Sequence, residues 1–232
     1  MWSKFTYKQL LTKSLLLTID SVAGSRILII TDSMAGNLGQ IREGTVKVMR
    51  GANPYSVLEF LQETPGLLNK VEVVLIHVET NYIGGKEEWK LYKNYQNNYI
   101  SKYQYEKALH HLNPPPASGP AICFVEIFQQ IIDFIKAQNE NAKVLVSGII
   151  PRIWDFARRR SIVAIYNNLL RKFNDQKSVY FIPTHKPYLN QNSEPKSELF
   201  CWDGLHLSDK GSIVLRSFFS SKLDKAKKGV LK

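Results

Sequence analysis

The stretch Val71-Glu72-Val73-Val74-Leu75-Ile76-His77-Val78 gives the strongest strand signal in the chain. Apart from Glu72 and His77 the run is apolar, and its apolar residues do not simply alternate with polar ones. Such a run is typical of a parallel strand covered on both faces. Further apolar runs occupy 26–30, 143–150 and 179–182, and a weaker one spans 46–49. These patterns predict five strands of one buried parallel sheet.

Segments with helical periodicity lie between and after these strands. Apolar residues recur at spacings of three and four in 57–61, 124–137, 162–173 and 208–223, and Ser208 is a suitable N-cap for the last of them. Strands that alternate with helices form a sheet with helices on both faces. The predicted fold class is therefore α/β, a three-layer α/β/α sandwich with a flavodoxin-like five-stranded parallel sheet of order 2-1-3-4-5.

The length of 232 residues suits a single domain, which we assign to 1–232. Its core spans about 26–223, and a helix is expected at 5–21. The segment 86–116 is rich in Tyr, Asn, Lys and Gln and ends in three prolines, so we interpret it as an excursion from the core.

The composition indicates a folded, basic protein. Hydrophobic residues make up 44% of the chain, and 31 Lys and Arg against 20 Asp and Glu give a net charge of +11. A charge of this sign favours anionic partners, here RNA or an anionic lipid surface. The alternative is that the charge binds nothing in particular. The sequence does not indicate an oligomeric state.

The cysteines and the apolar runs bear on the compartment. Cys123 and Cys201 form neither a disulfide framework nor a metal-binding spacing. No apolar run approaches the roughly 20 residues that span a bilayer, because Lys13 interrupts the run 10–19. These features favour an intracellular, cytoplasmic protein.

Polar residues follow the strands at the place where this fold binds ligands. In a sheet of order 2-1-3-4-5, a crevice opens at the carboxyl ends of strands one and three. Ser33 follows strand one, in a loop that we expect to lead into a helix, and Asn81 follows strand three. A serine hydroxyl needs an adjacent base to become a nucleophile, and His206, with Asp203 three residues before it, would supply the base and its orienting carboxylate. The alternatives are that Asp32-Ser33 caps a helix and that Asp203-Gly204 is an ordinary turn.

An ester hydrolase also needs donors for the oxyanion that develops during the reaction. The candidates for this oxyanion hole are the backbone N–H groups of Ser33 and Gly51 and the side-chain amide of Asn81. Gly51 could instead be a simple turn glycine, and Asn81 could form an Asx turn. His110, His111 and His185 have no partners at metal-ligand spacing, so we expect no metal and no cofactor.

Four blocks of the sequence resemble the SGNH (GDSL-type) hydrolase family over roughly 26–219. They are Thr31-Asp32-Ser33, Gly51, Glu79-Thr80-Asn81 and Asp203-Gly204-Leu205-His206. The resemblance implies a metal-free carboxylic ester hydrolase with Ser33, His206 and Asp203 as its catalytic residues. The chain departs from the family pattern at Thr31 and Glu79, where glycine is usual, and at Tyr82, where aspartate is usual.

Three segments are similar to a narrower group, the esterase domains in the first open reading frame of some non-LTR retrotransposons. The segments are 74–81, 146–152 and 203–208. This resemblance implies a metal-free acyl-ester hydrolase. Together with the candidate residues it leads us to predict a serine esterase that hydrolyses short-chain or lipid acyl esters through an acyl-enzyme. The alternative function is that of a weak or inactive hydrolase fold that serves as a basic module for binding nucleic acid or membrane.

Overall fold

The computed structural model describes residues 25–78, 94, 97–101, 103–104, 118–153 and 167–231. The predicted helix at 5–21 lies outside the described residues, as do most of the excursion 86–116 and the first part of the helix predicted at 162–173. Within the described ranges, no helix combines the length and the apolar character that a membrane span requires.

The described strands form one parallel sheet in the order β2-β1-β3-β4-β5, as predicted. The strands are β1 (Ile27–Thr31), β2 (Gly44–Val48), β3 (Val73–His77), β4 (Lys143–Ser147) and β5 (Val179–Ile182). Strands β3 and β4 are shorter than the apolar runs that predicted them. The chain leaves the sheet after His77 and Ser147, but apolar side chains beyond these strand ends, such as Val78 and Ile149, are still buried. Every residue of β1 and β3 is buried, as expected for central parallel strands.

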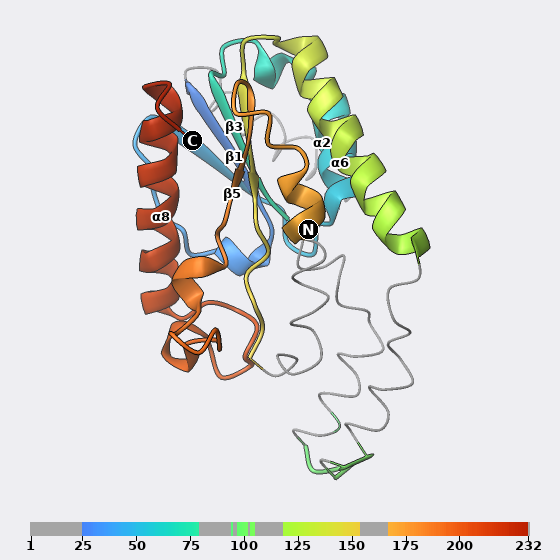
Figure 1. Ribbon diagram of the computed structural model, residues 1–232, viewed down its shortest axis with the longest axis vertical. Coiled ribbons are helices and arrows are strands. Elements are labelled where there is room, and N and C mark those ends of the chain that lie inside the picture. The colour runs from blue at the N-terminus through green and yellow to red at the C-terminus, as the bar shows by residue number, and fades with distance from the viewer. Residues whose placement is uncertain are drawn as a thin grey trace, which may run out of the picture.

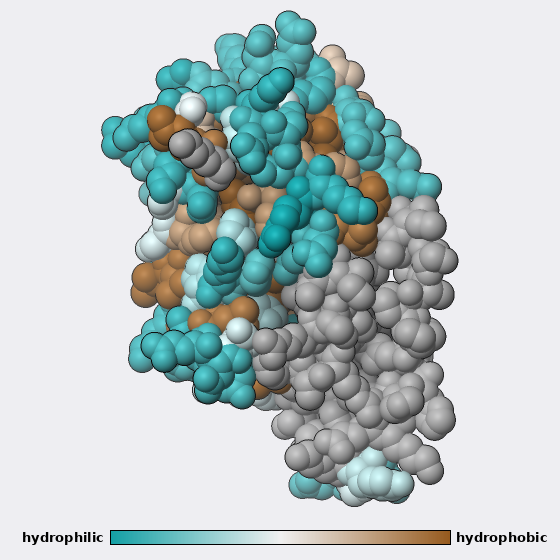
Figure 2. Space-filling model, in the orientation of Figure 1, coloured by the Kyte–Doolittle hydropathy of each residue, from teal (hydrophilic) through white to brown (hydrophobic). Residues whose placement is uncertain are grey.

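Helices cover both faces of this sheet (Figure 1). One face carries α2 (Pro54–Glu63) and α6 (Ser118–Gln138), and the other carries α8 (Asp209–Lys227). Alternate residues of β1 point to the two sides, so Leu28 and Ile30 pack with the first pair of helices, and Ile27 and Ile29 with α8. Most of the described surface in Figure 2 is hydrophilic, and hydrophobic residues form separate patches on it.

The last helix begins where the sequence predicts but ends later. The hydroxyl of Ser208 accepts the N–H of Gly211 at 3.2 Å, which confirms the predicted N-cap. The helix continues to Lys227, so the predicted end at Leu223 is wrong by one turn. This last turn is hard to predict from the sequence, because it is rich in lysine and has few apolar residues. After Leu223, the residues buried against the core are Ala226 and, beyond the helix, Leu231.

The segment after β1 also differs from the prediction. A helix was expected to follow the loop after Ser33, but the structure has only the 3-10 turn η1 (Ser33–Ala35) before Gly36. A single 3-10 turn has little cumulative dipole, so any electrostatic support for an anion beside Ser33 must come from individual N–H groups.

Candidate active site

Ser33 is held at the carboxyl end of β1 by its neighbour Asp32. The N–H of Asp32 donates to the carbonyl of His77 at 3.1 Å, and its buried carboxylate accepts the N–H of Met34 at 2.9 Å. Asp32 therefore caps the turn, as the alternative interpretation of Asp32-Ser33 proposed. That capping leaves the hydroxyl of Ser33 available for a different contact.

His206 and Asp203 lie in a tight loop just before α8. A hydrogen bond of 2.7 Å from the N–H of Cys201 to the carbonyl of His206 closes the loop. Within the loop, Gly204 adopts a positive φ of 63°, a backbone conformation that favours glycine. One carboxylate oxygen of Asp203 accepts the N–H groups of Leu205 and His206 at 3.0 and 2.9 Å. Asp203 is thus fixed by the backbone of the segment that carries the imidazole.

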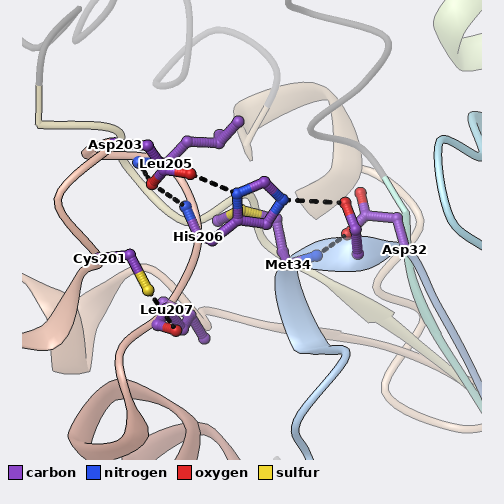
Figure 3. Close-up of polar contacts among 8 residues, drawn as sticks. Asp32, Met34, Cys201, Asp203, Leu205, His206 and Leu207 are labelled. Carbon is purple, nitrogen blue, oxygen red and sulfur yellow. Dashed lines mark hydrogen bonds and ion pairs between the residues drawn. The ribbon is translucent and has the colours of Figure 1, made fainter.

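The three side chains meet although they come from opposite ends of the described chain. Nδ1 of His206 lies 2.6 Å from Oδ2 of Asp203 (Figure 3). On the other side of the ring, Nε2 lies 3.3 Å from Oγ of Ser33. A carboxylate can only accept, so Nδ1 carries the proton and Nε2 presents its lone pair to the serine hydroxyl. This tautomer is the one that a general base facing Ser33 requires.

The charges around His206 favour its protonated form. The hydrogen bond with Asp203 raises the pKa of His206, partial burial lowers it, and the negative charges of Asp203 and Asp32 raise it further, so the net shift is upward. For Asp203, burial raises the pKa, but the hydrogen bonds from His206 and the two backbone N–H groups outweigh this effect and lower it. The pair is therefore arranged to stabilise an imidazolium once His206 has taken a proton.

Of the two remaining oxyanion candidates, only Gly51 is described. Gly51 is the third residue of a turn closed by the N–H of Ala52 and the carbonyl of Met49 at 3.0 Å, and its φ of 73° suits glycine. The N–H of Met49 donates to the carbonyl of Thr31 at 2.7 Å, which ties this turn to the end of β1. Asn81 lies outside the described residues.

A cavity of about 720 Å³ opens beside the Ser33–His206 pair. Its described lining also includes residues that the sequence analysis did not select, namely Met34, Gly36, Asn37, Val48, Arg50, Cys201, Leu207 and Ser212. Of these, Arg50 could have been noticed, since it immediately precedes Gly51 in the second block. Ser212 carried no such signal, because its position depends on how α8 packs.

The thiol of Cys201 is not a competing nucleophile. Its Sγ lies 3.3 Å from the carbonyl oxygen of Leu207, and burial and the charges of Asp203 and Asp209 raise its pKa. A thiol kept in its neutral form is a poor nucleophile at neutral pH. In the described part of the chain, no three or more His, Cys, Asp or Glu side chains gather to hold a metal ion.

A second pairing of histidine and serine lies inside the protein. Nδ1 of His77 is 2.8 Å from Oγ of Ser147, which in turn is 2.6 Å from the hydroxyl of Thr184. His77 and Ser147 are 1% and 0% exposed, and burial lowers the pKa of His77 to about 4. No substrate can reach this pair, so it joins the carboxyl ends of β3, β4 and the loop after β5 as a structural network.

The fold and the cluster together define a class: a doubly wound α/β protein with serine, histidine and aspartate side chains at the carboxyl edge of its sheet. Residues 43–212 match the sequence profile of the GDSL-like Lipase/Acylhydrolase family. The chain belongs to this family. The matched residues include Gly51, Asp203 and His206, whereas Ser33 precedes them.

Several solved structures share the fold at low sequence identity. A GDSL-like lipase from Bacteroides thetaiotaomicron is 13% identical with a TM-score of 0.61, over 95% of this chain and 98% of that one. A carbohydrate esterase of family 3 from Talaromyces cellulolyticus is 14% identical with a TM-score of 0.53, over 88% and 99%. A lipase/acylhydrolase from Enterococcus faecalis is 15% identical with a TM-score of 0.52, over 88% and 96%. No curated protein is a significant match to the sequence.

Proposed function

We propose that the protein is a serine hydrolase that cleaves carboxylic acyl esters through an acyl-enzyme. The observation that carries the proposal is the line of contacts from Asp203 through His206 to Ser33, with distances of 2.6 and 3.3 Å. The second distance is slightly longer than a tight hydrogen bond, as is common for a catalytic pair without substrate. Membership of the acylhydrolase family supports the same chemistry.

In the first half of the reaction, Oγ of Ser33 attacks the ester carbonyl carbon while Nε2 of His206 takes the hydroxyl proton. The tetrahedral intermediate collapses, the bond to the alcohol oxygen breaks, and His206 returns the proton to the leaving alcohol. Asp203 acts as a positioning residue, because it holds the ring and stabilises the imidazolium without touching the substrate.

In the second half, water attacks the acyl-enzyme and gives its proton to the same nitrogen of His206. The bond to Ser33 breaks, the carboxylic acid leaves, and the proton returns to Oγ. We assign the oxyanion to the backbone N–H groups of Ser33 and Gly51 and the amide of Asn81. A single donor of this kind is typically worth about 3 kcal/mol of barrier.

The direct test is hydrolysis of 4-nitrophenyl acetate and butyrate by the purified protein and by Ser33→Ala. Loss of the nucleophile should lower kcat by at least about a thousandfold. Ser221→Ala is the matched control, because Ser221 is exposed on α8. Equal rates for the wild type and Ser33→Ala, with both folded, would disprove the assignment.

Two narrower interpretations belong to this proposal and await their own tests. One is the relationship to retrotransposon esterase domains, which rests on the three sequence segments alone. The other is that the +11 charge attracts RNA or an anionic lipid surface. Binding by charge should weaken steeply as salt is raised. No contact among the described residues favours an inactive binding module over an esterase.

A further inference from the structure

The register of the sheet brings an arginine and the proposed nucleophile to the same cavity. Thr31 on β1 pairs with Val48 on β2. Ser33 and Arg50 each lie two residues beyond that pair, past the carboxyl ends of their strands. Both residues line the cavity of about 720 Å³ described above.

Arg50 is held on a short, well-anchored segment. It is the second residue of the turn that the Ala52-to-Met49 hydrogen bond closes, and the N–H of Met49 ties that turn to β1. The guanidinium therefore projects from a defined backbone position rather than from a long loop. A fixed backbone lowers the entropic cost of using the side chain to bind a ligand.

The charge of Arg50 is not neutralised by the described part of the protein. No ion pair or hydrogen bond joins its guanidinium to another described residue. None of the described cavity-lining residues is acidic. A guanidinium keeps its charge at any ordinary pH, so Arg50 is the one permanently charged side chain in the described lining. The nearby carboxylates of Asp32 and Asp203 are not part of that lining and accept backbone N–H groups.

We propose that the site selects esters that carry an anionic group, and that Arg50 is the residue that binds this group. The inference rests on the proposed esterase function. A carboxylate or a phosphate would accept two parallel hydrogen bonds from the guanidinium. The cavity is far larger than a reacting acetyl group needs, so it has room for such a substituent next to Ser33 and His206.

The test compares matched esters that differ in charge. Mono-4-nitrophenyl glutarate and 4-nitrophenyl valerate test a carboxylate on the acyl side. The pair 4-acetoxyphenyl phosphate and 4-acetoxybenzamide tests a phosphate on the alcohol side. The measured quantity is kcat/KM for the anionic ester divided by kcat/KM for its neutral partner. A substitution that lowers the activity on both esters by the same factor leaves this ratio unchanged.

The wild type should prefer the anionic member of at least one pair. Arg50→Gln should lower this ratio about tenfold, Arg50→Lys by less because it keeps the charge, and Arg50→Glu by more. The control is Arg42→Gln, which removes the same charge from an exposed residue before the opposite end of β2 and should leave the ratio unchanged. Added salt should reduce the wild-type preference, since Arg50 is exposed.

Two results would overturn the inference. One is a wild type whose kcat/KM for the anionic ester is no higher than that for its neutral partner in either pair. The other is an anionic preference that Arg50→Gln and Arg50→Glu leave intact. In both cases the neutral esters are still cleaved in a manner that depends on Ser33, so the proposed function stands. A protein that cleaves none of the four esters would contradict the proposed function itself.

Discussion

His77 offers a test of the core beneath the site, because its ring is buried and neutral. Burial lowers its pKa from 6.5 to about 4. In the unfolded chain the ring binds a proton near pH 6.5, whereas in the folded protein it resists protonation until about pH 4. Stability is therefore fully present above pH 6.5 and is lost as the pH falls towards the folded pKa.

The size of the effect follows from the two pKa values. Each pKa unit corresponds to about 1.4 kcal/mol, so the full loss is about 3 kcal/mol, of which about 2 kcal/mol is expressed at pH 5. The comparison protein is His77→Gln, which does not titrate and keeps a polar group near Ser147. Other titrating groups, including His185, are present in both proteins and cancel in the difference.

The assay is urea unfolding of both proteins at pH 8 and pH 5. The free energy of unfolding of the wild type should fall by about 2 kcal/mol more than that of His77→Gln. NMR titration of the histidine rings provides a second measurement on the wild type alone, in which the ring of His77 should stay neutral down to about pH 5. Equal losses in the two proteins, or a His77 ring that titrates near pH 6.5, would refute the reasoning.

Two further substitutions test the site and the loop that carries it. Asp203→Asn should lower kcat by about a thousandfold or more. It should also move the acid limb of the pH profile of kcat/KM for 4-nitrophenyl butyrate to lower pH. The reason is that the hydrogen bond with Asp203 is the largest effect that raises the pKa of His206. An acid limb that does not move would contradict this prediction. Gly211→Ala would force a Cβ onto the carbonyl oxygen of Leu199 and should cost about 1–3 kcal/mol in urea unfolding. Gly66→Ala, whose Cβ meets nothing within 4 Å, is the control, and similar losses in both would contradict the packing argument.

The sheet could be predicted because its strands are the apolar runs of the sequence. Runs such as 71–78 are typical of buried parallel strands, and 2-1-3-4-5 is a common order for five such strands that alternate with helices. The ends of the helices and strands were predicted less accurately than their existence. The last turn of α8 is hidden among lysines, and the helix expected after Ser33 is a single 3-10 turn.

The pairing of Ser33 with His206 was expected from their residue types and from the resemblance to the SGNH family rather than from the topology of the sheet, because His206 lies in the loop before α8 and not at the end of a strand. The surroundings of the pair were not. The predicted strand order places β2 beside β1, but the place of Arg50 also depends on the register between these two strands, which the residue pattern does not show. Cys201 and Ser212 reach the cavity through the packing of α8 and its preceding loop, which the sequence does not reveal.

The most direct measurement for the central claim is labelling with a fluorophosphonate, which reacts with serines activated as nucleophiles. The account predicts one labelled site for each chain, found by mass spectrometry on the peptide that contains Ser33. Labelling should persist in Ser221→Ala and vanish in Ser33→Ala, and Cys201 should remain unmodified. Labelling at another residue, or equal labelling of the wild type and Ser33→Ala, would contradict the account.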